Sequence, residues 1–147
     1  MQEGITFATK LAQAGIRVTL IADAAMLSRI RATKIVLVGA DSVSTSGLVN
    51  KMGTSMLALA AKSLKKDFYS ACTTEKFLPA RYQLPQEPAK PAKEITKKDV
   101  PNLAVSNYYF DITPLDWLTA VVTESGKLGP EELKQRLRQM KVHPALA

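Results

Sequence analysis

The spacing of apolar residues divides the chain into segments with helical periodicity and segments with strand periodicity. Apolar side chains that recur every three or four residues predict helices. These helices cover 5–14 and 54–65 and follow Asp23, Thr113 and Gly129. Short runs rich in β-branched and apolar residues predict strands at 17–22, 35–38, 68–72 and 103–110. Because helical segments separate the strands, we expect parallel pairing and a Rossmann-like three-layer α/β domain with a mostly parallel sheet.

One segment interrupts this alternation. Residues 78–101 hold five of the eight prolines of the chain, and proline blocks helices and removes donors from β-ladders. The segment should therefore be an extended excursion, of the kind that is functional or packs on a neighbouring chain. With 147 residues, 46% of them hydrophobic, the chain 1–147 is expected to form a single domain around one core.

The most informative stretch is IVLVGADSVSTSGLVNKMGT, residues 35–54. It predicts a buried strand that ends at a glycine, an aspartate just beyond it, a Ser/Thr/Gly loop, a polar pair, and a second glycine that opens a helix. In open parallel sheets, ligands bind beyond the carboxyl ends of the strands. Asp41, Asn50 and Lys51 are therefore the candidate site residues.

Each of these three residues has a chemical and a structural interpretation. The Asp41 carboxylate can act as a general acid or base, or it can cap the turn by accepting backbone N–H groups, and the pattern favours neither. Asn50 could orient a hydroxyl, and Lys51 could hold a phosphate or an enediolate oxygen. Alternatively, Asn50 lies in a turn and Lys51 in solvent.

Composition narrows the function classes. The net charge is +7, and residues 62–99 carry nine Lys and Arg against five Asp and Glu. Such a basic segment could attract RNA. However, few aromatic residues interleave with the basic ones, and no RNA-module pattern is present. A solvated basic surface is therefore expected, and nucleic-acid binding is not. No run reaches the roughly 18 apolar residues of a membrane helix. The chain has a single cysteine, Cys72, and so low a cysteine content is typical of cytoplasmic proteins. We expect Cys72 to fill space in the core as a small apolar side chain. We expect no cofactor and no metal site.

The stretch GADSVSTSGLVNKMGTSMLALAAK, residues 39–62, resembles the signature of the family that joins the alpha, beta and delta subunits of initiation factor 2B with two aldose-phosphate isomerases. Those isomerases act on ribose 1,5-bisphosphate and on methylthioribose 1-phosphate. Further motifs over nearly the whole chain are similar to those of the family and stand in the same order. They are Glu3-Gly4 with Ala8, Leu11 and Gly15-Ile16; Asp23-Ala24-Ala25; Thr74 with Lys76; FDITP at 110–114; and VVTESG at 121–126.

The resemblance implies a C-terminal domain that follows a helical N-terminal domain in complete members. It also implies homo- or hetero-oligomers formed through the C-terminal domain, here with the Pro-rich segment and the Trp117 helix, and a sugar phosphate or nucleotide as ligand. In the isomerases, an aspartate that matches Asp41 and an upstream cysteine move protons or hydride. Residues that match Asn50 and Lys51 contact the sugar phosphate.

The chain also departs from the family. This chain has no counterpart of the family's first strand, which carries an Arg-containing phosphate loop, or of the helical domain that carries the catalytic cysteine. Tyr108 stands where the family usually has a proline. We therefore expect further sequence upstream of Met1 in the complete protein and no enzymatic activity from this chain alone. The main interpretation is a regulatory or scaffold domain in translation initiation with part of a sugar-phosphate site. The alternative is the C-terminal part of an aldose–ketose phosphate isomerase.

Overall fold

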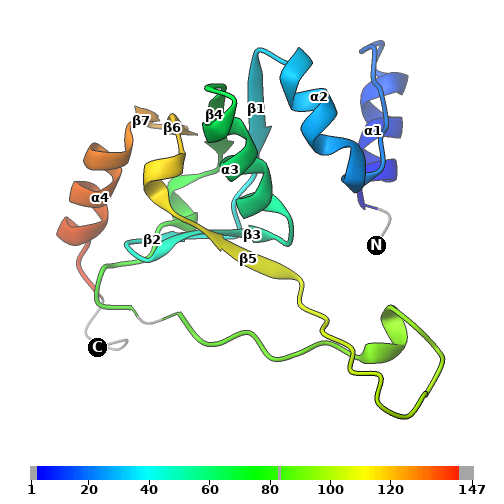
Figure 1. The fold of residues 1–147 in the computed structure, drawn as a ribbon. Coiled ribbons are helices and arrows are strands. Elements are labelled where there is room, and N and C mark those ends of the chain that lie inside the picture. The colour runs from blue at the N-terminus through cyan, green and yellow to red at the C-terminus, as the bar shows by residue number, and fades with distance from the viewer. Residues whose placement is uncertain (1–2, 83, 143–147) are drawn as a thin grey trace.

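The computed structural model describes residues 3–82 and 84–142 (Figure 1). Its α-helices are α1 (Glu3–Gln13), α2 (Met26–Ala32), α3 (Thr54–Ser63) and α4 (Pro130–Gln139). Its strands are β1 (Ile35–Val38), β2 (Ser42–Ser44), β3 (Gly47–Lys51), β4 (Asp67–Ala71), β5 (Phe110–Thr113), β6 (Ala120–Thr123) and β7 (Gly126–Leu128). Single 3-10 turns are η1 (Asp23–Ala25), η2 (Thr74–Lys76), η3 (Ala92–Glu94) and η4 (Leu115–Trp117). Within the described ranges, no helix is long and apolar enough to cross a membrane.

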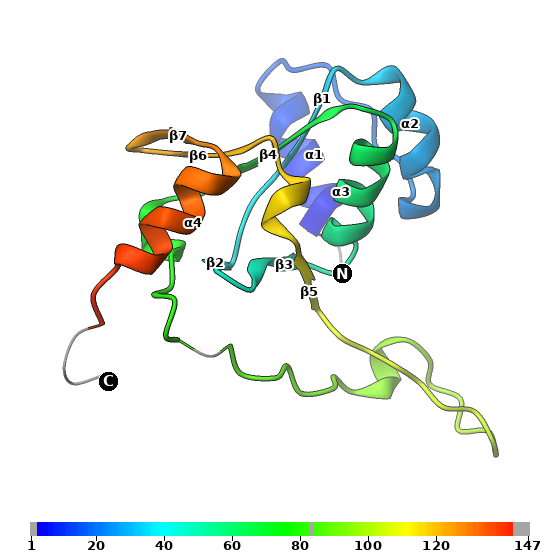
Figure 2. The same ribbon diagram turned by 60° about the vertical axis from the view of Figure 1, so that its left-hand side comes forward.

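The main sheet has the strand order β1-β4-β6-β7. β1 pairs with β4 and β4 with β6 in parallel, whereas β7 turns back antiparallel on β6. α3 connects β1 and its hairpin to β4 and packs on both parallel strands (Figures 1 and 2). These pairings confirm the predicted α/β architecture with a mostly parallel sheet, and the predicted strand at 35–38 matches β1.

Residues 42–51, which were expected to form a loop, form a β-hairpin instead. β2 and β3 pair antiparallel, and β5 adds to β3 to complete a second sheet of order β2-β3-β5. Val43 and Leu48 face each other across the hairpin and are fully buried. The loop prediction is wrong because this strand pattern has only a few apolar positions among serine, threonine and glycine, which conceal its period of two.

The core lies between the two sheets and the helices α3 and α4. Small residues of α3, Ala58 and Ala61, are completely buried and let that helix approach the strands closely. The last predicted helix is confirmed, with Leu133 and Leu137 one turn apart on the buried side of α4. The other large side chains at the centre are Phe68, Val43, Val121 and Leu48.

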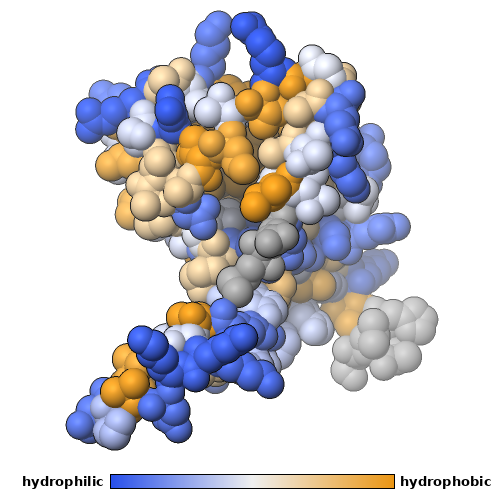
Figure 3. Space-filling view, turned by 90° about the vertical axis from the view of Figure 1, so that its right-hand side faces the viewer, coloured by the Kyte–Doolittle hydropathy of each residue, from blue (hydrophilic) through white to orange (hydrophobic). Residues whose placement is uncertain are grey.

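The predicted strand at 17–22 is not formed. This segment is extended, but it has no strand partner within the described residues, and β-propensity alone does not stabilise an unpaired strand. Val18 and Leu20 remain exposed there, as do Ile35 and Leu37 on the outer face of β1. Figure 3 views this side of the molecule and shows apolar side chains around a hollow.

Four further predictions about strands, helices and helix caps need correction. Of the predicted strand 103–110, only Phe110 belongs to β5, because the preceding residues run along an excursion from the body. The predicted Trp117 helix is the single turn η4, and the apolar stripe that follows it lies in β6, since Val121 fits a buried strand as well as a helix. Thr113 is not a helix cap: it ends β5, and its buried hydroxyl has no hydrogen-bond partner among the described residues. Likewise Asp23 lies inside η1 rather than capping α2.

We call residues 78–82 and 84–109 the arm. It leaves the body, turns around η3 and returns to β5 (Figures 1 and 2). Hydrogen bonds join its two limbs near the body: the Glu87 carboxylate accepts the N–H groups of Tyr109 at 2.9 Å and Phe110 at 3.1 Å. Further out, the Lys90 N–H donates to the Asn107 carbonyl at 2.8 Å. The arm is therefore an ordered element that lacks a ladder of its own.

Candidate functional site

The candidate site begins where β1 ends. The Gly39 carbonyl accepts a hydrogen bond from the Ser70 hydroxyl at 3.0 Å, which fixes the end of β1 against β4. Two residues later, the Asp41 N–H donates to the Val49 carbonyl at 2.9 Å and closes the base of the hairpin. The Asp41 side chain is exposed, and the described residues offer its carboxylate no hydrogen bond. The backbone of Asp41 thus has a structural role while its carboxylate stays available for chemistry.

Asn50 connects the end of β1 to the start of α3. Its Nδ2 donates to the Thr54 hydroxyl at 3.0 Å, and that hydroxyl donates to the Lys51 carbonyl at 2.7 Å. The Asn50 Oδ1 lies 4.0 Å from the position that a Cβ on Gly39 would occupy. The structure therefore brings Asn50 to the strand end that precedes Asp41, with one amide edge held by α3.

Lys51 extends toward α1 and the base of the arm. Its Nζ lies 3.3 Å from the Glu3 carboxylate and 4.7 Å from the centroid of the Tyr109 ring. The Lys51 side chain is 47% exposed, so an anion can approach its ammonium. Glu3 occupies the anionic position beside it in this structure, and an exposed pair of this kind exchanges partners readily.

Asp111 is a functional residue that the sequence reasoning missed. It lies opposite Asn50 in the β3–β5 ladder, and its carboxylate accepts the N–H groups of Gly53 at 2.8 Å and Ser55 at 3.1 Å. The Ser55 hydroxyl adds a third bond at 2.9 Å. A carboxylate at a helix N-terminus satisfies free backbone donors and complements the helix dipole. No local signal identifies this cap, because Asp111 lies more than fifty residues after Gly53 and Ser55, whose N–H groups it accepts.

A second polar group lies beyond β4 and β6. The Glu124 carboxylate accepts hydrogen bonds from the hydroxyl and the N–H of Thr74, and the hydroxyl bond lowers the pKa of Glu124. Burial raises the pKa of the Cys72 thiol, and the negative charge of Glu124 raises it further. The positive charge of Lys76 lowers this pKa but does not offset the increase. Cys72 packs against the core with a protonated thiol, in agreement with its predicted role as an apolar filler.

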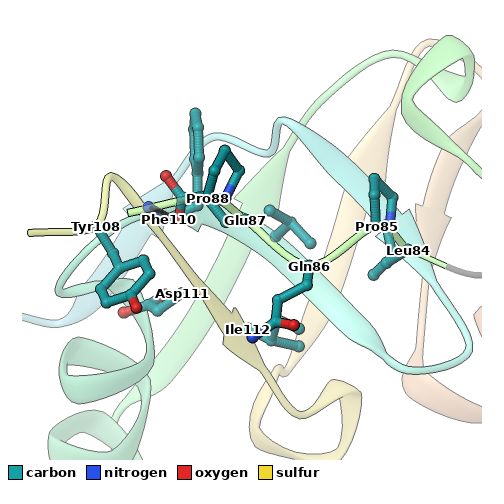
Figure 4. A pocket seen from close by; sticks show the side chains of 10 residues that line it. Leu84, Pro85, Gln86, Glu87, Pro88, Tyr108, Phe110, Asp111 and Ile112 are labelled. Carbon is teal, nitrogen blue, oxygen red and sulfur yellow. Dashed lines mark hydrogen bonds between the residues drawn. The ribbon is translucent and has the colours of Figure 1, made fainter. Parts of the chain in front are cut away.

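A cavity of about 580 Å³ lies at the base of the arm (Figure 4). Its walls come from the arm and from β3 and β5, and most of them are apolar. The lining residues are Val49, Leu84, Pro85, Gln86, Glu87, Pro88, Tyr108, Phe110, Asp111 and Ile112. None of the three predicted site residues lines it, so this cavity and the end of β1 are separate features.

The end of β1 presents a free carboxylate and an amide, and the neighbouring Lys51 adds an accessible ammonium that faces Glu3 and Tyr109. The carboxylate can accept or donate a proton, while the amide and ammonium can hold hydroxyl or phosphate oxygens. The described residues leave this site open to solvent on one side, since Asp41 and Lys51 are both exposed. Within those residues, no cluster of three or more His, Cys, Asp or Glu side chains could hold a metal ion.

Comparison with known proteins adds the following findings. The chain is 39% identical over 127 residues to a ribose 1,5-bisphosphate isomerase of Archaeoglobus fulgidus, covering 83% of this chain and 41% of that protein. Its fold is similar to the crystal structure of the Pyrococcus horikoshii translation initiation factor eIF-2B, with a TM-score of 0.72 and 33% identity, covering 87% of this chain and 45% of that one. It is also similar to a 5-methylthioribose 1-phosphate isomerase of the same organism, with a TM-score of 0.75 and 26% identity, covering 88% of this chain and 38% of that one.

These relatives support the predicted resemblance, and among the two functional interpretations they favour the isomerase alternative over the initiation-factor role. The chain spans less than half the length of each of them. Residues 1–130 match the sequence model described as the initiation factor 2 subunit family. Because this match covers most of the chain, the chain belongs to the initiation factor 2 subunit family.

Proposed function

We propose that this chain supplies one wall of the active site of an aldose–ketose phosphate isomerase. The observation that carries the proposal is the free Asp41 carboxylate at the end of β1, beside Asn50 and on the same hairpin as Lys51. The similarity to a ribose 1,5-bisphosphate isomerase makes that sugar bisphosphate the first substrate to test, and methylthioribose 1-phosphate the second.

The proposed chemistry uses each residue for one task. Converting a cyclic aldose phosphate to a ketose phosphate moves a hydrogen with its bonding electrons from C2 to C1, breaks the bond between C1 and the ring oxygen, and transfers the proton of the C2 hydroxyl to that oxygen, which leaves a ketone at C2. Asp41 accepts the hydroxyl proton, because an unpaired carboxylate can act as a general base. Asn50 orients a sugar hydroxyl, and the Lys51 ammonium binds a phosphate.

The ring oxygen needs a proton donor from elsewhere. In this chain Cys72 packs against the core and its pKa is raised by burial, so we do not assign that task to it. We propose that the opposite wall, with the donor and further phosphate ligands, comes from polypeptide that corresponds to the part of the relatives not spanned here. The active form is then the complete protein in the cytoplasm, assembled as an oligomer.

The test is an Asp41→Asn substitution in the protein at its natural length, assayed with both sugar phosphates. Loss of a general base lowers kcat by about 10²-fold or more, while the fold should be retained because the Asp41 side chain makes no contact that holds the hairpin. Asp99→Asn is the matched control, since it removes an exposed carboxylate from the arm. Turnover by Asp41→Asn at the wild-type rate would contradict the assignment.

A scaffold role in translation initiation is the second candidate, supported by the similarity to the eIF-2B structure. A scaffold subunit would bind purified initiation factor 2 and turn over neither sugar phosphate. A pull-down with initiation factor 2, run beside the isomerase assays, separates the two functions. Binding without turnover in the complete protein would select the scaffold role.

A further inference from the structure

Tyr109 lies where the arm joins the body. Its hydroxyl donates a hydrogen bond to the Glu94 carboxylate at 2.7 Å, and its N–H donates to Glu87 at 2.9 Å. Its carbonyl accepts the N–H of Met52, just after β3, at 2.7 Å. Contacts from both limbs of the arm and from the body therefore fix the position of this ring.

Two ammonium groups face the Tyr109 ring. Lys51 Nζ lies 4.7 Å and Lys90 Nζ 5.0 Å from the ring centroid, both within the range of cation–π attraction. Lys90 is also paired with Glu87 of the arm at 3.5 Å. The ion pair of Lys51 with Glu3 is weak, because the two side chains are 47% and 71% exposed. The ring is thus the better-ordered partner of Lys51.

We propose that Tyr109 is a positioning residue that holds the Lys51 ammonium at the end of β3, where it meets a phosphate of the substrate. Tyr109 does not touch the substrate. The proposal rests on the assignment of Lys51 to the sugar-phosphate site under the proposed function. In this proposal, the base of the arm helps to build the phosphate-binding part of the site.

The contact suits a phosphate-binding lysine. A ring face attracts the ammonium without using its three N–H donors individually, so these remain free for phosphate oxygens when Glu3 is displaced. The hydrogen bond to Glu94 raises the pKa of Tyr109, so the phenol stays neutral and protonated. The ring accordingly stays at one place while the anionic partner of Lys51 exchanges.

A spectroscopic test measures the contact directly. Lysines of the natural-length protein are reductively methylated with ¹³C, which keeps their charge, and the Lys51 methyl signal is assigned by its loss in Lys51→Arg. Ring current from Tyr109 should displace this signal from those of solvent lysines such as Lys97. Tyr109→Leu should abolish the displacement, whereas Tyr109→Phe should keep it. Tyr108→Leu, the matched control, should also keep it, since Tyr108 lines the cavity instead.

A kinetic test measures the consequence. Losing a cation–π contact of an exposed lysine corresponds to about 2- to 5-fold weaker binding. Tyr109→Leu should therefore raise KM for ribose 1,5-bisphosphate by that factor with little change in kcat, because the contact supports ground and transition states alike. Tyr108→Leu should leave both values unchanged.

The two tests separate this proposal from the function on which it rests. A wild-type Lys51 signal without displacement overturns the positioning role, and this measurement needs no Tyr109 variant to fold. An unchanged KM in an active Tyr109→Leu protein also overturns it. If the wild-type protein turns over neither sugar phosphate, the isomerase function and the role in substrate binding fail together. A displacement that persists in Tyr109→Leu shows that another group holds Lys51.

Discussion

Gly47 begins β3 at a point where β5 lies directly against its backbone. A Cβ there would lie 2.6 Å from the Ile112 Cγ2 and 2.7 Å from the Thr113 carbonyl oxygen, and the φ of 146° is one that other residues rarely adopt. Gly47→Ala should therefore lower the free energy of unfolding by roughly 2–4 kcal/mol, as measured by urea denaturation. Gly4→Ala is the control, because nothing lies within 4 Å of that position in α1. Equal stability of the two variants would contradict this account of the strand contact.

At this scale the sequence pointed to Asp41 and Asn50, whose site roles stay predictions, and missed Asp111, which holds the start of α3 through Gly53 and Ser55. Asp41 and Asn50 could be found because they follow a recognisable strand end. Asp111 could not, since its bonds to Gly53 and Ser55 depend on the β3–β5 pairing, which brings distant segments together. Coordinates were also needed to show that the Asp41 carboxylate caps no turn of the described chain, while its acid/base role stays a prediction.

Among the elements, the helices α1, α2, α3 and α4 and the parallel strands β1 and β4 were predicted, whereas the parallel strand β6 was predicted as part of a helix. β1 is an apolar run and β4 is rich in aromatic and small residues, so both stand out locally. The hairpin β2–β3 is mostly polar, and 17–22 has the composition of a strand but no partner in the described chain. The composition of a segment indicates how well it suits a β-strand, but whether the segment pairs depends on which strand lies beside it in the fold.

The base of the arm is the element whose stability should depend most on pH. Hydrogen bonds from Tyr109 and Asn107 lower the pKa of Glu94. Burial raises the pKa of Glu87, but the N–H groups of Tyr109 and Phe110 and the charge of Lys90 more than offset it. Carboxylates with lowered pKa values stabilise the folded arm above their ordinary pKa, and that contribution is lost as pH falls through the lowered value.

Amide exchange at the arm base should therefore accelerate, relative to β4, as the pH falls below about 4.5, the ordinary value for glutamate. The informative probe is the Lys90 N–H, which bonds across the limbs to Asn107. Glu94→Gln should weaken this pH dependence, with Glu87 supplying what remains. Protection of the Lys90 amide that keeps pace with β4 down to pH 3 would show that these carboxylates do not hold the arm.

At the scale of the whole molecule, several elements of the described chain expose large apolar side chains. The outer arm exposes Ile95, Val100 and Leu103, while α1 and β1 expose Phe7 and Leu37. Figure 3 shows apolar side chains on the side of the molecule that it views. Trp117, expected to be a core or interface anchor, is half-buried and packs on the core, with Lys62 over its ring at 5.8 Å. Any association of the C-terminal half should therefore depend on the arm rather than on Trp117.

We expect this chain to self-associate through the outer arm, because the arm holds its apolar side chains in an ordered element away from its own core. Burial of three such side chains per protomer favours association by several kcal/mol. Light scattering at high micromolar concentration should detect an oligomer that the double variant Ile95→Glu, Leu103→Glu dissociates. Leu37→Lys in β1 is the matched control and should leave the oligomer intact. Dissociation by Leu37→Lys alone would transfer the interface to the edge of β1, and a strictly monomeric wild type would exclude both.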